Sequence, residues 1–281
     1  MGRHRKPSSV NIGRSSVIAL SGLVPAGIVT VAGASDLDTA EQAAIQQSPG
    51  DDQDALGLRS QSLDEAVAHA MAKQGTVAPP VVKSVALPAN REVANMPAGQ
   101  LGVPGVAIAA YQNAERTLIA ENPDCGMPWY LLAGIGRVES THAFGGKADA
   151  EGNPLTPVYG PVLDGSLWGN NVIHDSDDGE LDGLAGYDRA VGPMQFLPET
   201  WKRYAADGNG DGIADPQNLY DAALTAGKYL CAGNLNMRNT AQQTRAILRY
   251  NNSMAYVANV MAWANSYNTG VAPKPAELPR I

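Results

Sequence analysis

The sequence predicts a mainly α-helical domain in the last two thirds of the chain, preceded by a segment that adds little to a hydrophobic core. Apolar residues recur at helical spacing from about residue 103 onward, between prolines and capping residues that start and stop helices. Low-complexity stretches at the front of the 281 residues leave room for one sizeable core. The 44% hydrophobic content is that of an ordinary globular protein.

Residues 1–34 have the three parts of a secretory signal. A basic cluster at the N-terminus is followed by an apolar stretch over residues 17–31 and then by Ala32-Gly33-Ala34. The apolar stretch is just long enough for a tilted membrane anchor, but Pro25 and three glycines weaken that interpretation. We expect export with cleavage after Ala34, and the alternative is an N-terminal segment retained as a membrane tether.

Residues 35–102 have the composition of a low-complexity linker with two short helices. One helical pattern covers residues 39–47, and the other begins at Ser62, which forms a capping box with Glu65. Five prolines and few core-forming residues accompany them. We expect this region to span distance and to be largely disordered.

Six helices are predicted between residues 103 and 270, each from its apolar spacing and its end signals. They run from Pro104 to near Asn122, from Pro128 through Glu139, from Pro198 through Tyr204, from about Asp221 to Cys231, from Thr240, with Gln243 completing its cap, to Tyr250, and from Ser253 to about Tyr267. Residues 271–281 form a C-terminal tail.

Residues 145–190 interrupt these helices with a long irregular insertion. The segment is rich in Gly, Pro and Asp, has no sustained period, and leaves room for a small β-ribbon. Long irregular loops in compact domains are usually functional. We therefore expect this loop region to face a substrate.

The net charge and the cysteine content limit the classes of partner that the protein can bind and the cellular compartment in which we expect it. The net charge of −8, with no basic cluster beyond the N-terminus, argues against nucleic acid as a partner. An even pair of cysteines in an exported chain predicts a disulfide, here Cys125–Cys231, and two buried free thiols are the alternative.

Glu139 is the carboxylate with the most unusual surroundings in the sequence. Leu132, Ile135 and Glu139 lie at positions i, i+3 and i+7 of one helix, so the carboxylate projects from its apolar stripe. Apolar surroundings raise the pKa of a carboxyl group, and a Glu protonated near neutral pH can act as a general acid. The alternative from helix geometry alone is an exposed carboxylate or one paired with Arg137 or Arg189.

Several motifs follow one another in a recognisable order. Glu139-Ser140 is followed by the DRAVGPMQFLPETW block of residues 188–201, by an Asp-rich loop over residues 207–216 and by Tyr250-Asn251. This ordered set closely resembles the membrane-bound lytic transglycosylase B family, particularly its actinobacterial members. The resemblance covers about residues 103–270.

The resemblance implies a lysozyme-like helical fold and cleavage of peptidoglycan glycan strands by a protein associated with the cell wall. Cleavage would occur at the MurNAc–GlcNAc β-1,4 bond and form 1,6-anhydro-MurNAc, with Glu139 as the single acid and base. Gln195, Tyr250 and Asn251 would contact substrate or orient Glu139. The reaction requires no cofactor, and we expect a monomer.

Two other functions remain open beside the lytic transglycosylase. A hydrolytic muramidase needs a second carboxylate at a defined separation from the first. The irregular region offers five candidates, for which a solvated loop or a structural turn is the alternative: Asp175, Asp177, Asp178, Asp182 and Asp188. A non-catalytic glycan-binding module is the third possibility, against which the intact Glu139 motif counts.

Residues 207–221 have the pattern of a calcium loop. Asp207, Asn209 and Asp211 alternate as calcium ligands do, and Gly212 stands at the sixth position, where the loop turns sharply. Asn218 replaces the acidic residue at position twelve, and Asp221, at position fifteen, matches the lengthened loop of some family relatives. With the Ile213 carbonyl these residues would bind a structural Ca²⁺, and the alternative is a metal-free Asp/Gly turn.

The aromatic residues divide into core and candidate sugar-binding positions. Trp129, Trp201 and Trp263 stand at helical spacing among apolar neighbours and are expected in the core. Trp168 lies in the irregular region and is the candidate for stacking on a sugar. The four histidines are scattered and have no metal-ligand spacing.

Overall fold

The computed structural model describes residues 81–82, 87–167 and 171–281. All of the described residues belong to one compact unit. The predicted signal segment, the two short linker helices and Trp168 lie outside the described residues. In the described part no helix combines the length and the apolar character needed to cross a membrane.

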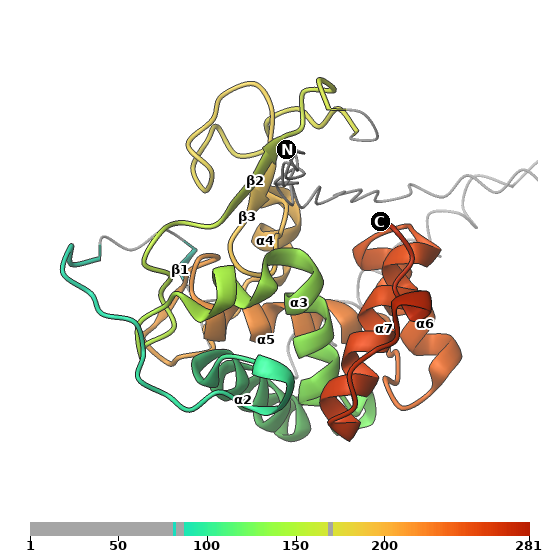
Figure 1. The fold of residues 1–281 in the computed structure, drawn as a ribbon. Coiled ribbons are helices and arrows are strands. Elements are labelled where there is room, and N and C mark those ends of the chain that lie inside the picture. The colour runs from blue at the N-terminus through green and yellow to red at the C-terminus, as the bar shows by residue number, and fades with distance from the viewer. Residues whose placement is uncertain (1–80, 83–86, 168–170) are drawn as a thin grey trace, which may run out of the picture. The chain divides into compact units, whose positions relative to one another are not determined.

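The described domain is mainly helical, as the sequence predicts (Figure 1). Its α-helices are α2 (Gly105–Glu121), α3 (Trp129–Gly146), α4 (Pro198–Tyr204), α5 (Leu219–Cys231), α6 (Thr240–Tyr250) and α7 (Met254–Thr269). Short 3-10 helices occur at Gln100–Gly102, Pro123–Cys125 and Pro275–Glu277. All six predicted helices are present, with ends within a few residues of the expected positions apart from α3.

The helix caps correct two details of the sequence prediction. Asn239, not Thr240, caps α6, because its side chain accepts a hydrogen bond from the Gln242 amide. Helix α5 begins two residues earlier than expected, since the Asn218 side chain accepts from the Tyr220 amide at 2.8 Å. Both asparagines satisfy amides in the first turn that have no partner within the helix.

The irregular region contains the small β-ribbon for which the sequence left room. Strand β2 (Tyr159–Val162) pairs antiparallel with β3 (Arg189–Val191), with an irregularity in the register between Tyr159 and Val162. In Figure 1 this ribbon lies close to α4, which follows β3 in the chain. A second pair, β1 (Val81–Val82) and β4 (Ile213–Ala214), runs parallel.

The core forms where α3 packs against α7 and α2, while α2 also packs against α5 (Figure 1). Gly134 permits the close approach of α3 to α7, since a Cβ atom there would lie 2.6 Å from the Val260 carbonyl oxygen. Trp201 is fully buried in the core as expected, whereas Trp129 and Trp263 are partly buried against it.

A disulfide cross-links the domain, and the segments before and after the helices are bonded to it. Cys125 and Cys231 are bonded to each other, as the sequence predicts, with their Cα atoms 5.5 Å apart. Within the segment assigned to the linker, Arg91 pairs with Asp149 at 3.1 Å and so attaches residues before 103 to the domain. In the tail, the Asn259 side chain donates to the Pro279 carbonyl at 2.7 Å.

Candidate active site

Glu139 lies in the last right-handed turn of α3, where the apolar stripe of the helix faces the core. Leu132 and Ile135 are fully buried, and Glu139 itself is only 2% exposed. The predicted placement of this carboxylate on the buried stripe is therefore confirmed. A glutamate buried to this degree must be neutral, or it must have partners that offset its charge.

Burial raises the pKa of Glu139 from about 4.5 to about 8. The Tyr256 hydroxyl donates a hydrogen bond to Oε1 of Glu139 and opposes this rise by stabilising the ionised form. Neither arginine considered from the sequence is an ion-pair partner among the described residues: Arg137 lies over the Trp263 ring and Arg189 over the Tyr159 ring. The carboxyl group is thus protonated at neutral pH.

The backbone changes from a right-handed to a left-handed helical conformation directly after the Glu139-Ser140 pair. Five consecutive residues, Thr141 to Gly145, have φ between 53° and 82°, so α3 ends in a turn of left-handed helix. Such a conformation costs about 1–2 kcal/mol per non-glycine residue and persists only where the surroundings hold it. The right-handed helix predicted from Pro128 through Glu139 therefore stops close to the catalytic candidate.

Ser140 stabilises this change of conformation with two hydrogen bonds. Its hydroxyl donates to the Pro193 carbonyl at 2.7 Å and accepts from the Ala143 amide at 2.9 Å. One hydroxyl therefore joins three pieces of backbone: the end of the right-handed helix, the left-handed turn, and the Gly192–Phe196 segment of the DRAVGPMQF block.

His142 holds the left-handed turn from inside the core. Its Nδ1 lies 3.0 Å from the Tyr111 hydroxyl of α2, and its Nε2 lies 3.1 Å from the Tyr267 hydroxyl of α7. Burial, with a smaller contribution from the charge of Arg137, lowers the pKa of His142 to about 3, so the ring is neutral. No sequence pattern indicates a role for this histidine, because both partners are far from it in the chain.

Gln195 lies in a tight turn between β3 and α4. The Val191 amide donates to the Phe196 carbonyl, the Gln195 amide donates to Gly192, and Gln195 adopts the left-handed region with φ 52°. Its side-chain Nε2 donates back to the Gly192 carbonyl at 2.9 Å, while its buried Oε1 has no hydrogen-bond partner. A buried acceptor without a donor is unfavourable unless a ligand or water supplies one.

Tyr250 holds the same turn from the end of α6. Its hydroxyl donates to the Met194 carbonyl at 2.7 Å, and its ring stacks on Tyr256 with an interplanar angle of 9°. Asn251, the C-cap residue of α6, is buried. Glu139, Gln195 and the Tyr250-Asn251 pair, which are far apart in the sequence, are therefore linked through Ser140, Tyr256 and the turn.

Tyr256 is the functional candidate that the sequence did not single out. It stands in the first turn of α7, where the Ser253 hydroxyl accepts from the Tyr256 amide as an N-cap. The sequence contains one signal for the position of Tyr256. This is the Ser253 cap, which lies two residues after the Tyr250-Asn251 motif and sets the start of the helix. No pattern in the sequence indicates that the side chain at the third helical position points at α3.

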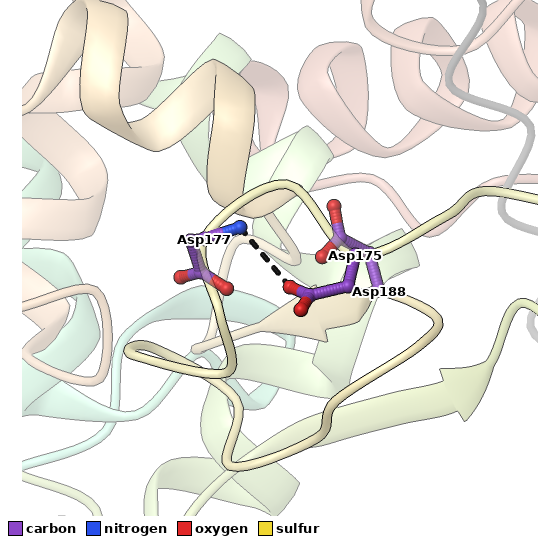
Figure 2. Close-up of side chains that lie close together, drawn as sticks. All are labelled: Asp175, Asp177 and Asp188. Carbon is purple, nitrogen blue, oxygen red and sulfur yellow. Dashed lines mark hydrogen bonds between the residues drawn. The ribbon is translucent and has the colours of Figure 1, made fainter.

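The acidic loop is more buried than a solvated loop would be. Asp177, Asp182 and Asp188 are buried, Asp175 is partly exposed, and Asp178 is exposed. Most of their carboxylate oxygens accept hydrogen bonds from the loop itself; Ser176, for example, donates both its amide and its hydroxyl to Asp188. Structural turns therefore account for much of the acidic run (Figure 2).

The carboxylates predicted to bind calcium accept hydrogen bonds from amides of their own loop. Gly210 and Gly212 amides donate to the two carboxylate oxygens of Asp207, and the Gly208 and Asp215 amides donate to Asp221. Within the described residues, Asp207, Asp211 and Asp221 do not form a group whose oxygens lie within 4.8 Å of one another. The all-oxygen donor set still suits Ca²⁺.

The comparisons with known proteins give one match. The model of the transglycosylase SLT domain matches residues 174–242. This segment is about a quarter of the chain and contains the acidic loop, the Gln195 turn and the Asp207–Asp221 loop, but not Glu139 or Tyr250. No match to the chain was found among the curated proteins or the solved structures.

Proposed function

We propose that the protein is a lytic transglycosylase that cleaves the β-1,4 bond between MurNAc and GlcNAc in peptidoglycan. The observation that carries the proposal is the buried carboxyl of Glu139, which has a pKa of about 8 and accepts a hydrogen bond from Tyr256. Its helix is joined through Ser140 to the turn that bears Gln195. That turn lies within the segment that matches the transglycosylase domain, which supports this class of reaction.

In the first step, Glu139 gives its proton to the glycosidic oxygen. The bond between this oxygen and C1 of MurNAc breaks, and the GlcNAc side departs with a hydroxyl group. The N-acetyl carbonyl of the same MurNAc stabilises the positive charge that develops at C1. A general acid with a pKa near the working pH is well matched to this transfer.

In the second step, ionised Glu139 takes the proton of the C6 hydroxyl while that oxygen forms a bond to C1. The product is 1,6-anhydro-MurNAc, and Glu139 is protonated again. The Tyr256 hydroxyl stabilises the ionised carboxylate between the two steps, since hydrogen bonds to charged groups are the stronger ones. Neither water, a second carboxylate nor a cofactor takes part.

The substrate contacts are part of the same proposal. The Oε1 of Gln195 would accept from an acetamido N–H of the glycan, because it is a buried acceptor without a protein partner. Asn251 and Tyr250 would contact the neighbouring sugar, and Trp168 would stack on a ring. We further propose an exported monomer whose N-terminal segment is a signal or a membrane tether, with structural Ca²⁺ in the Asp207–Asp221 loop.

The products formed in ¹⁸O water test this function. The full chain should release muropeptides with 1,6-anhydro-MurNAc ends and no label, as measured by mass spectrometry. Glu139→Gln should lower kcat at least about 100-fold, because an amide neither donates nor accepts the proton. Glu199→Gln, which makes the same change at an exposed glutamate, should retain the parent rate.

Two outcomes would contradict the proposal. Labelled reducing ends, together with an acidic-loop aspartate as essential as Glu139, would make the protein a muramidase. Binding to glycan without cleavage, at equal affinity in the parent and in Glu139→Gln, would make it a binding module.

A further inference from the structure

A group of three carboxylates lies in the irregular region, outside the Glu139 site. Asp175, Asp177 and Asp188 each offer an oxygen, and these oxygens all lie within 4.8 Å of one another. Figure 2 shows that the residues come from two arms of the loop, Asp175 and Asp177 from one and Asp188 from the returning one. Two oxygens that bind the same Ca²⁺ at about 2.4 Å are at most about 4.8 Å apart, which matches this spacing.

Among the residues that the structure describes, no basic side chain forms an ion pair with Asp175, Asp177 or Asp188. Lys202 pairs with Glu180 at 3.6 Å, and the Arg189 guanidinium lies over Tyr159. Three carboxylates therefore lie close together, two of them buried, without an ion-pair partner in the described part of the chain, which is unfavourable unless a cation joins them.

One carboxylate of the group has an oxygen without a hydrogen bond. Asp177 is 7% exposed; its Oδ2 accepts from the Leu181 amide, but its buried Oδ1 has no partner. The other two carboxylates are hydrogen-bonded by the loop, Asp175 by the Asp177 and Gly179 amides and Asp188 by Ser176. A buried carboxylate oxygen without a donor calls for a ligand, and in this acidic surrounding the ligand that fits is a cation.

We propose that Asp175, Asp177 and Asp188 bind a divalent cation, and that this cation is Ca²⁺. All three ligands are hard oxygen donors, which disfavours Zn²⁺ and the softer metals. An irregular loop suits Ca²⁺, which accepts variable geometry and can complete its shell with carbonyl oxygens and water, whereas Mg²⁺ requires a near-ideal octahedron. The site is separate from the Asp207–Asp221 loop and does not depend on the chemistry of Glu139.

The cation would tie the two arms of the acidic loop together. Asp188 directly precedes β3, which leads into the turn that bears Gln195. A bound Ca²⁺ therefore fixes the start of the segment that Ser140 and Tyr250 hold at its other end. This role explains carboxylates in the loop without giving them a part in catalysis.

Calcium titration of the full chain tests the site, with isothermal calorimetry as the measurement and Asp211→Asn as the background that disables the other loop. In this background we expect one bound Ca²⁺. Adding Asp177→Asn should weaken binding at least about ten-fold, because the amide keeps the shape but removes the charge. Adding Asp164→Asn, an exposed aspartate of the same irregular region, should leave the affinity unchanged.

A second variant separates a loss of calcium binding from a loss of the fold. Asp175→Asn keeps an oxygen for the Asp177 and Gly179 amides at a partly exposed position, so its circular dichroism spectrum should match that of the parent. Loss of calcium binding in this folded variant supports the site. The proposal is overturned if the Asp211→Asn protein binds no Ca²⁺, if binding survives both substitutions, or if Mg²⁺ binds as tightly as Ca²⁺. Glycan cleavage enters none of these measurements, so the site can fail while the proposed function holds.

Discussion

At the scale of single residues, the candidate site depends on two opposed effects at one carboxyl group. Burial among apolar side chains favours the neutral form of Glu139, and the hydroxyl of Tyr256 favours the ionised form. The result is a pKa of about 8, at which proton donation and proton acceptance are both accessible near neutral pH. The two effects can be separated by substitution.

Replacing Tyr256 with Phe should move the pH dependence of cleavage. Without the hydroxyl, the pKa of Glu139 rises further above 8. Glu139 is the active acid below its pKa, so the alkaline decline of kcat/KM should shift to higher pH. Because the ionised intermediate loses a hydrogen bond worth about 1.5–3 kcal/mol, kcat should fall about 10- to 100-fold. A pH–rate profile measures both effects.

Tyr204→Phe is the matched control for this experiment. Tyr204 is a partly buried tyrosine that packs on the ring of Tyr229, and no hydrogen bond joins it to Glu139. Its substitution should leave the alkaline decline of kcat/KM at the same pH as in the parent. If kcat/KM declines at the same alkaline pH in Tyr256→Phe and in the parent, Tyr256 does not change the pKa of Glu139.

At the scale of elements, the left-handed end of α3 is the feature that sets the direction of the chain after Glu139. Four of its five residues are not glycine, so the turn is strained by itself. The bonds of Ser140 to Pro193 and of His142 to Tyr111 and Tyr267 hold it. Packing by α2 and α7 thereby maintains a conformation that the local sequence does not favour.

His142→Phe should destabilise the fold, and by an amount that depends on pH. At pH 7 two buried tyrosine hydroxyls lose a partner, at about 1–3 kcal/mol each. The folded parent keeps His142 neutral down to a pKa of about 3, whereas the unfolded chain takes up a proton below about pH 6.5. The parent therefore loses stability as the pH falls from 6.5 toward 3, and the variant lacks this loss.

Urea unfolding at pH 7 and pH 5 measures this difference. The free energy gap between the parent and His142→Phe should shrink by about 2 kcal/mol at pH 5, which corresponds to about 1.5 pKa units. His174→Phe, at an exposed histidine stacked on Tyr187, serves as the control and should show no such change. A gap that is equal at both pH values would contradict a buried, neutral His142.

At the scale of the whole molecule, distant parts of the chain are joined around one core. The disulfide closes a separation of 106 residues, between the 3-10 helix before α3 and the end of α5. The Met237 amide donates to the Cys125 carbonyl at 2.7 Å, so the segment after α5 is attached at the same place. The cross-link therefore surrounds α3, the acidic loop and the Gln195 turn in sequence.

Removal of the disulfide should lower the stability of the fold substantially. In the chain-entropy model a loop of this length contributes about 4–5 kcal/mol, and Cys125→Ala with Cys231→Ala should lower the free energy of unfolding by about that amount in urea. Thiol titration of the parent protein, unfolded without reductant, should find no free thiol. Two titratable thiols would contradict the bond.

Much of the architecture follows from the sequence, because helix signals are local. Prolines at first turns and capping side chains fixed the starts of α2, α3, α4 and α7 to within a residue. The i, i+3, i+7 spacing placed Glu139 on the buried face for the same reason. The missed cap at Asn239 is also local, but Thr240 beside it is an equally good capping residue, so propensity alone could not separate them.

Other features depended on contacts between parts that are far apart in the chain. The sequence by itself determined a helical domain, an even number of cysteines and one glutamate on an apolar stripe, since each follows from local spacing or from composition. Only the tertiary structure decided that Tyr256 meets Glu139 and that His142 stabilises a left-handed turn. It also decided that Asp177, Asp182 and Asp188 of the acidic run are buried and that one oxygen of Asp177 has no hydrogen-bond partner. These depend on the packing of α7, α2 and the returning arm of the loop, which no local pattern specifies.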